Sequence, residues 1–425
     1  MFRPETPASP WLRRFALLLV FATLVLLALG GLVTSHGVGM AVPDWPNTYG
    51  YNMFAFPVSK WVGGILYEHS HRLMAACVGL LTTLLAAWLW MRETRSREKW
   101  LGLGAIVLVL VLMGIRVLPV YVMLAALALM AAAFSLYQIH QKPGALRWWG
   151  MLAFAVVIFQ GVLGGLRVVW FKDQIGIFHA ALAQLFFVLV CVISYLTRYA
   201  VVLPSPGAAI STRGLQHSNA VVPETVALGD GRAPLPLRQL FLTATLLIFV
   251  QLVLGATMRH QHAGLAIPDF PLAYGKLWPA MDAGSITLYN QHRLETLALN
   301  SITAFQVGLQ MAHRLVAVSI CVVVACCCWL AWRQLGARHS VSRRALVWLG
   351  LILAQGLLGA ATIWSNKAAD IATAHVLVGA LALASGTLLW LVCPPGEATA
   401  RRETSVRAMT ATPFGAQTSA AHGLD

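Results

Sequence analysis

Two short histidine–arginine motifs carry the residues best suited to chemistry in this chain. They read Glu-His-Ser-His-Arg-Leu-Met-Ala at 68–75 and Gln-Met-Ala-His-Arg-Leu-Val-Ala at 310–317. Each opens a run of about twenty apolar residues, which is long enough to cross a bilayer. A histidine one turn inside a membrane helix is costly unless it has a partner. His71 and His313 are therefore predicted to bind something within the membrane.

Two further histidines extend the pattern into an internal repeat. His179 and His375 each open another apolar run, and each follows a Gln-Gly-x-x-Gly segment, at 160–164 and 355–359. The loops that precede the His-Arg motifs also match, as Gly-Met-Ala-Val-Pro-Asp-Trp-Pro (39–46) and Gly-Leu-Ala-Ile-Pro-Asp-Phe-Pro (264–271). Both halves begin on the same side of the membrane, so the repeats are parallel. Each half thus supplies a pair of histidines near one surface.

A pair of histidines from facing helices suits a haem. Two neutral imidazoles can occupy both axial positions of the iron, while apolar side chains surround the macrocycle. The glycine runs let helix backbones approach closely and leave room for a flat ring. Arg72 and Arg314, beside the ligands, could pair with the haem propionates. The predicted iron ligands are His71, His179, His313 and His375.

Di-iron and zinc sites fit the sequence less well than a haem does. Glu68-x-x-His71 has the spacing of di-iron bundles, but the chain has only 15 acidic residues and almost none lies in an apolar run. A zinc site needs a third or fourth ligand, and no regular partner occurs in both halves. Two alternatives stay open: a di-haem electron-transfer protein linked to quinone, and a transporter that uses the histidines as proton relays.

The two halves differ at one chemically important position. Glu68 lies three residues before His71, on the same helical face, whereas Gln310 occupies that place in the second half. A carboxylate at membrane depth can accept a proton or orient water, and an amide cannot titrate. The first half is therefore predicted to perform chemistry and the second to hold a resident cofactor.

The composition indicates a polytopic all-α membrane protein. The chain has 425 residues, of which 59% are hydrophobic and 11% charged, with a mean hydropathy of +0.73; soluble domains carry about 25% charged residues. The net charge of +15 comes from basic residues in short loops between apolar runs. Such residues determine topology, so a nucleic-acid partner is not expected.

Ten apolar spans are predicted, at 12–35, 70–91, 101–116, 119–140, 148–168, 175–197, 237–258, 311–332, 343–364 and 372–393. Basic residues concentrate in the loops on one side, which places both termini in the cytoplasm and the protein in the cell (inner) membrane. Residues 1–198 are expected to form one four-helix bundle, with 101–140 inserted as an extra hairpin, and 237–393 a second bundle. A cytoplasmic linker at 199–236 and a disordered tail at 394–425 complete the organisation.

The remaining histidines and the seven cysteines carry no predicted site. The cysteines all lie in or at the ends of apolar runs and give no disulfide framework. Five histidines that break the repeat are treated as non-ligands: His36, His69, His260, His262 and His292. Four more are expected on the cytoplasmic surface: His140, His217, His339 and His422.

These motifs together resemble the haem A synthase family, membrane enzymes that oxidise haem O to haem A for cytochrome oxidases. The resemblance rests on Glu68-x-x-His71-Arg72, the paired loops, both Gln-Gly-x-x-Gly segments, His179, His313-Arg314 and His375. It covers most of 12–197 and 237–393. It implies two tandem four-helix bundles, a haem b held by His313 and His375, and a haem O substrate bordered by His71 and His179.

The resemblance further implies that Glu68 takes part in turnover, in which a ring methyl is oxidised through successive hydroxylations to an aldehyde. Haem O from a haem O synthase, an electron acceptor and the cytochrome oxidase biogenesis pathway are the implied partners. Two features depart from the family pattern. Residues 36–68 contain no cysteine, although some members carry a cysteine pair there, and the hairpin at 101–140 is additional.

Overall fold

Helices make up almost all of the regular structure in the described part of the chain. The computed structural model describes residues 9–199, 235–296 and 300–393, so the predicted linker and tail lie outside the described residues. The helices are α1 (Pro10–Ser35), α2 (Gly63–Glu93), α3 (Ser96–Met113), α4 (Leu118–Gln141), α5 (Leu146–Trp170), α6 (Asp173–Tyr199), α7 (Leu235–His260), α8 (Ala283–Thr296), α9 (Ala304–Leu335), α10 (Ser340–Trp364) and α11 (Ala369–Val392).

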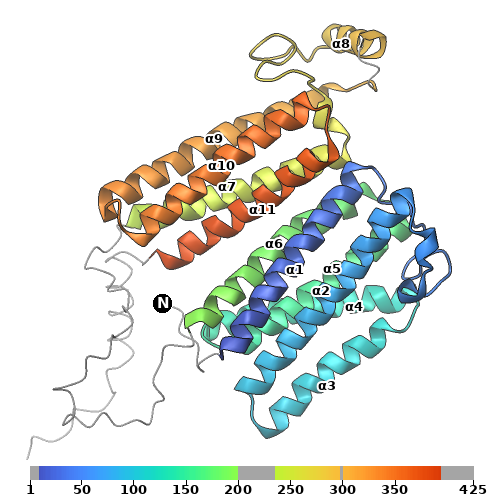
Figure 1. Ribbon diagram of the computed structural model, residues 1–425, viewed down its shortest axis with the longest axis vertical. Coiled ribbons are helices and arrows are strands. Elements are labelled where there is room, and N and C mark those ends of the chain that lie inside the picture. Colours follow the sequence, from blue (N-terminus) through green and yellow to red (C-terminus); the bar gives the residue numbers. More distant parts are fainter. Residues whose placement is uncertain (1–8, 200–234, 297–299, 394–425) are drawn as a thin grey trace, which may run out of the picture.

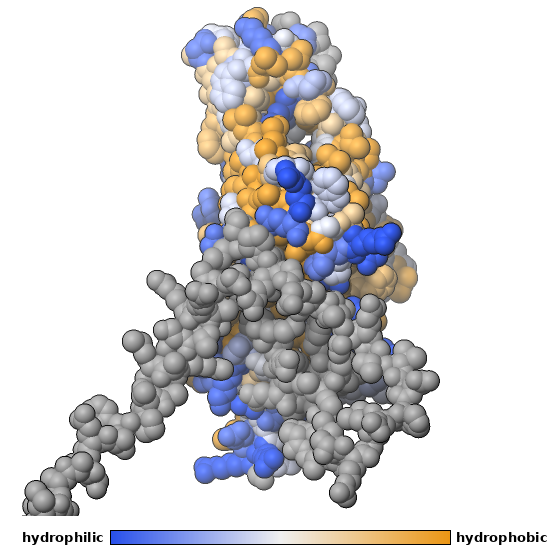
Figure 2. Space-filling model, turned by 90° about the vertical axis from the view of Figure 1, so that its left-hand side faces the viewer, coloured by the Kyte–Doolittle hydropathy of each residue, from blue (hydrophilic) through white to orange (hydrophobic). Residues whose placement is uncertain are grey.

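The predicted class of all-α polytopic membrane protein is confirmed. Nine of the described helices are long and apolar enough to cross a membrane. The remaining predicted span, 101–116, corresponds to α3, which has only 18 residues and carries three charges in its first four positions. The apolar part of α3 is therefore shorter than a membrane-spanning helix requires, and α3 is not one of the nine. Figure 2 shows a broad hydrophobic area on the lateral face of the molecule, beside clusters of hydrophilic residues.

The helices form two four-membered groups that lie side by side (Figure 1). The first group contains α1, α2, α5 and α6, and the second contains α7, α9, α10 and α11. The side chains buried between the helices of each group are mostly apolar and pack closely. The two groups have the same helix order, as the repeat in the sequence requires.

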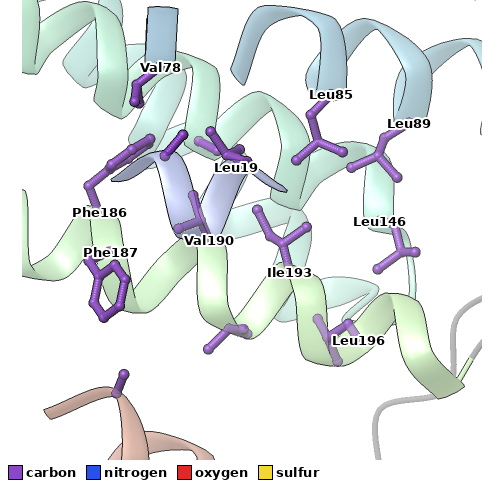
Figure 3. Packing of buried hydrophobic residues seen from close by; sticks show 14 of the residues in the cluster. Leu19, Val78, Leu85, Leu89, Leu146, Phe186, Phe187, Val190, Ile193 and Leu196 are labelled. Carbon is purple, nitrogen blue, oxygen red and sulfur yellow. The ribbon is translucent and has the colours of Figure 1, made fainter. Parts of the chain in front are cut away.

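Each group has its own interior. In the first, Leu19, Leu85 and Ile193 are fully buried and meet between α1, α2 and α6 (Figure 3). In the second, Trp348 on α10 is fully buried. Its indole N–H donates to the Ala382 carbonyl at 2.8 Å, which satisfies a buried donor that would otherwise be costly.

The groups contact one another mainly through α1 against α11 and α6 against α7. Gly31 on α1 lies so close to Thr373 on α11 that a Cβ there would come within 2.8 Å of its side chain. The Ser35 and Thr373 hydroxyl oxygens are 3.4 Å apart. From α7, Arg259 donates to the Gly31 carbonyl at 2.8 Å and to the Ser35 hydroxyl. Arg259 therefore links the second group to the first helix of the chain.

The hairpin of α3 and α4 lies on the outside of the first group, against α2 and α5 (Figure 1). The two helices of the predicted hairpin are joined by a short connection, because α3 ends at Met113 and α4 begins at Leu118. Tyr121 and Leu124 of α4 are buried against Val162 and Leu166 of α5. The hairpin thus packs away from the faces that carry the four predicted ligands.

Helix α8 was not predicted, because its polar sequence resembles neither an apolar span nor a strong amphipathic helix. It lies beyond the end of the second group (Figure 1). Arg293 on α8 is buried and donates to the Leu265 carbonyl at 2.7 Å. The rings of Tyr289 and Tyr274 stack with centroids 3.7 Å apart. These contacts hold α8 on the loop that follows α7.

Candidate functional site

The four predicted ligands lie on equivalent helices of the two groups. His71 is on α2 and His179 on α6, whereas His313 is on α9 and His375 on α11. His71 and His179 lie within electrostatic range of each other, as do His313 and His375. The fold therefore brings together two pairs of imidazoles whose members are far apart in sequence.

Each imidazole packs against a glycine of a neighbouring helix. The glycines are on α1, α5, α7 and α10, which are the helices of the two groups that carry no ligand. A Cβ added at Gly30, Gly164, Gly255 or Gly359 would lie 3.0, 3.2, 3.3 or 3.2 Å from Cε1 of His71, His179, His313 or His375, respectively. Such distances are too short for ordinary carbon contacts. We call these four positions the glycine seats.

A polar side chain one turn before three of the seats supports the histidine-bearing helix. Gln160 Nε2 donates to the His179 carbonyl at 2.8 Å, and Gln251 Nε2 donates to the His313 carbonyl at 2.9 Å. Gln355 Nε2 lies 3.5 Å from His375 Nε2. Leu26 takes this place on α1. The sequence reading missed Gln251 and its seat, although the Gln-x-x-x-Gly spacing of 251–255 repeats that of 160–164.

The orientation of the four rings suits iron ligation. Nδ1 of each ring is buried without a hydrogen-bond partner, while each histidine as a whole is only partly buried. The rings of His71, His179 and His375 lie near main-chain atoms of the neighbouring helix, at Leu26, Gln160 and Gln355, and Nδ1 makes no hydrogen bond to them. A ligating imidazole leaves one ring nitrogen for such a second partner.

Pairs of imidazoles are the donor sets that this fold offers. Within the ranges 9–199, 235–296 and 300–393, no group of three or more His, Cys, Asp or Glu side chains could hold a metal ion. Two imidazoles beside glycine-lined helices fit a haem iron, whose other four ligands come from the macrocycle itself. The residues present therefore fit a haem in each group.

Glu68 and Arg72 anchor the loop between α1 and α2 in the first half. Glu68 is buried, accepts a hydrogen bond from the Val42 N–H at 2.8 Å and pairs with Arg72 at 2.7 Å. Arg72 also donates to the carbonyls of Val42, Asp44 and Asn47, at 2.7, 2.6 and 3.0 Å. The carboxylate is thus held one turn from His71, with both oxygens engaged.

The second half repeats this anchor with an amide. Gln310 accepts from the Ile267 N–H at 2.6 Å and donates to the Ile267 carbonyl at 3.2 Å. Arg314 donates to the carbonyls of Asp269 and Leu272 at 2.7 and 2.8 Å. An amide can donate as well as accept. Gln310 therefore donates to the Ile267 carbonyl, whereas the equivalent carbonyl of the first half, that of Val42, accepts from Arg72. Both arginines donate hydrogen bonds from Nη1 and Nη2 to main-chain carbonyls of the loops.

The loops themselves are built alike. Asp44 accepts from the N–H groups of Tyr49 and Gly50, at 2.7 and 2.8 Å. Asp269 accepts from Tyr274 and Gly275, at 2.8 and 2.9 Å. Each loop contains a cis proline, after Trp45 and after Phe270, and has positive φ angles at the same two positions. The repeat in the sequence is thus a repeat in structure, down to single hydrogen bonds.

Comparison with known proteins assigns the chain to a family. Residues 113–387 match the family COX15-CtaA, described as cytochrome oxidase assembly protein. The chain belongs to this family.

Several relatives within it are called heme A synthase. That of Geobacillus kaustophilus is 22% identical over 378 residues, which cover 86% of this chain and 86% of the relative. That of Shouchella clausii is 24% identical over 291 residues, or 68% and 72% of the two chains. That of Rhodospirillum centenum is 34% identical over 155 residues, or 36% and 38%.

This member of the family has further polar groups between its two helix groups. His260, at the end of α7, lies against Gly176 of α6, where a Cβ would overlap its ring. Its Nδ1 is 3.9 Å from Asp173, and it lies within electrostatic range of His179. Burial and the nearby charge of Arg259 lower the pKa of Lys367, in the loop after α10. Arg259 and Lys367 thus bring two basic side chains near each other at this end of the interface.

Two other histidines, His69 on α2 and His36 directly after α1, serve packing. His69 is fully buried, with Nδ1 3.2 Å from the Thr48 hydroxyl and its ring against Phe56 and Trp61. His36 stacks on Tyr67, with ring centroids 4.5 Å apart. His217 and His422 lie outside the described residues.

Proposed function

We propose that this protein is a haem A synthase, a membrane oxidoreductase that converts haem O to haem A for cytochrome oxidase. The observation that carries the proposal is the duplicated pair of glycine-seated imidazoles in a member of the COX15-CtaA family. Relatives that align along most of their length bear the name heme A synthase. The di-haem electron-transfer alternative has no such support from the comparisons.

In this proposal the two helix groups have different roles. His313 and His375 hold a resident haem b, and His71 and His179 border the site of haem O. The difference rests on Glu68, because its counterpart Gln310 makes equivalent loop contacts but cannot titrate. Arg72 and Arg314 remain predicted haem-binding residues at the edge of each site.

The residues of the first group have definable tasks in turnover. Oxidation of a methyl to a formyl group, with water as the oxygen source, releases protons and electrons. Glu68, one turn from His71, would accept such protons, and Arg72 holds its carboxylate in position. His71 and His179 fix the substrate iron. Haem b, when bound, supplies a one-electron relay for the oxidation.

The proposed cellular setting follows from the lipid-facing helices. Haem O from a haem O synthase would enter laterally from the bilayer, since its farnesyl tail is apolar. An electron acceptor completes the cycle, and haem A passes into cytochrome oxidase biogenesis. The described chain ends of both groups lie at one end of the molecule (Figure 1), which we place on the cytoplasmic side of the cell membrane.

The direct test is expression in a cell that makes haem O but no haem A, followed by chromatography of the extracted haems. A formyl-bearing haem is expected. If the protein is present in the membrane and no formyl-bearing haem is found, the proposal is contradicted. The alternative of electron transfer without haem modification would then be favoured.

A second test addresses the resident cofactor. His313→Ala and His375→Ala should each remove the low-spin haem b spectrum of the purified protein, because one imidazole cannot fill both axial positions. His71→Ala serves as the matched control and should retain that spectrum. A full haem b spectrum in either second-half variant would show that the cofactor assignment is wrong.

A further inference from the structure

Arg167 is a cation near the first histidine pair that the sequence reading did not single out. It lies on α5, three residues after the seat Gly164, and therefore one turn farther along the same helical face. Its side chain reaches the loop between α1 and α2, where a Cβ at Gly39 would lie 3.1 and 3.2 Å from its Nη2 and Nη1. Arg167 lies within electrostatic range of both His71 and His179.

The guanidinium group of Arg167 has no partner in the described part of the chain: it forms neither a hydrogen bond nor an ion pair. The two carboxylates in electrostatic range are Glu68 and Asp173. Glu68 is already engaged by Arg72 and the Val42 N–H. The Asp173 side chain is 64% exposed and faces His260. Arg167 thus remains partly buried without a contacting anion.

This cation belongs to the first half alone. The equivalent residue of α10, seven positions after Gln355, is Thr362, whose hydroxyl donates to the Leu358 carbonyl of its own helix. The arginines of the two His-Arg motifs are equivalent, with Nη1 and Nη2 on loop carbonyls in both halves. The first site therefore has one additional, unpartnered charge.

We propose that Arg167 binds a propionate carboxylate of the haem that enters the first site, and so fixes the orientation of the substrate macrocycle. The inference rests on the proposed function. A partly buried guanidinium is stabilised by a contacting carboxylate, which it can engage through two parallel hydrogen bonds. The propionates are the acidic groups of a haem. Because Arg167 lies on one side of the site, the engaged propionate determines which ring edge faces Glu68.

The test measures haem affinity, independently of turnover. Full-length protein, with its second site saturated, is titrated with ferric iron protoporphyrin IX and with the dimethyl ester of its propionates. Only the binding that His71→Ala abolishes is assigned to the first site. Arg167→Gln should weaken binding of the free acid by about tenfold to a hundredfold. For the ester, which offers no carboxylate, Arg167→Gln and wild type should bind alike.

Two controls isolate the interaction. Lys172→Gln removes an exposed positive charge near the same end of α5 and should leave both affinities unchanged. Arg167→Lys keeps the charge but loses the two-pronged contact, so it should recover part of the affinity for the acid.

The outcomes separate this proposal from the proposed function. Equal weakening of acid and ester by Arg167→Gln, or no weakening, would overturn the role of Arg167 while the function stands. Absence of any His71-dependent haem binding in the wild type would overturn the substrate site itself. Should Arg167→Gln not accumulate, Arg167→Lys decides: affinity lowered for the acid alone supports the proposal, and unchanged affinity for both ligands overturns it.

Discussion

Glycine positions the histidine rings in this protein more directly than any polar group does. At each seat the absence of a Cβ lets an imidazole approach the backbone of a neighbouring helix. The neighbouring glycines Gly161 and Gly356, in the same sequence motifs, have open space around them. The two glycines of each Gln-Gly-x-x-Gly segment thus differ in function, and substitution can separate them.

Gly359→Ala should reduce the haem b content of the purified protein by roughly twofold or more. The added methyl would push the His375 ring by a few tenths of an ångström, which takes up most of the roughly 0.5 Å within which a ligand must be held, and so weakens ligation. Gly356→Ala is the matched control, with nothing within 4 Å of its Cβ. It should keep full haem content and can gain up to about 1 kcal/mol of helix stability. The haem-to-protein ratio of each variant is measured by absorbance. Equal ratios in Gly359→Ala and Gly356→Ala would show that Gly359 does not position the His375 ring.

Glu68 combines an anchoring role with the proposed chemical one, and two substitutions distinguish them. Glu68→Gln can keep the hydrogen bond from the Val42 N–H, just as Gln310 accepts from the Ile267 N–H. The free energy of unfolding should therefore change by about 1 kcal/mol or less. Haem O conversion should nevertheless fall by about 10²–10⁴-fold, as expected when a proton acceptor is lost. Glu68→Ala should lose conversion and also about 1–3 kcal/mol of stability. Undiminished conversion in Glu68→Gln would leave Glu68 with the anchoring role alone.

At the scale of elements, close helix contacts set the geometry of each group. Gly386 on α11 lies at such a contact: a Cβ there would be 2.5 Å from the Thr245 hydroxyl on α7 and 2.7 Å from the Trp348 ring on α10. All three helices meet at this point. Because protein interiors are close-packed, an added methyl must displace one of them.

Gly386→Ala should therefore lower the free energy of unfolding by about 1–3 kcal/mol, the usual cost of overpacking. Gly350→Ala on α10 is the comparison variant, since its Cβ would meet nothing within 4 Å. Thermal unfolding in detergent, followed by circular dichroism, gives the difference. Unfolding midpoints that fall by the same amount in both variants would show that the contact is not tight.

At the scale of the whole molecule, α1 is shared between the two helix groups. It packs within the first group and also along α11 of the second. Arg259 of α7 donates to its backbone, and the hydroxyls of Ser35 and Thr373 approach each other. The two proposed haem sites are thus held in a fixed relation, which electron transfer between them requires.

This arrangement predicts a specific crosslink. Ser35→Cys combined with Thr373→Cys should form a disulfide under mild oxidation, because the two native hydroxyl oxygens are 3.4 Å apart. With a protease site introduced between residues 200 and 234, the cut halves should migrate together on a non-reducing gel and separately after reduction. Each single cysteine variant controls for the seven native cysteines. Halves that separate without reduction would contradict the packing of α1 on α11.

The sequence by itself determined the class, the repeat and the candidate ligands. Runs of about twenty apolar residues can only be membrane helices in so uncharged a chain, and a polar residue such as His179 is conspicuous there. The hairpin at 101–140 was predictable for the same reason. Helix α8 was not, because a short polar helix owes its stability to tertiary contacts such as those of Arg293.

Only the tertiary structure decided which neighbours these residues have. Gly30 and Gly255 became seats because helices distant in sequence place His71 and His313 against them. Glu68 proved to be engaged by a loop, and Arg167 to have no partner among the described residues, for the same reason. An apolar pattern specifies that a helix is buried in lipid or protein. It does not specify the neighbour, because burial against any apolar surface is about equally favourable. Which glycine meets which ring is set by packing, which no local pattern contains.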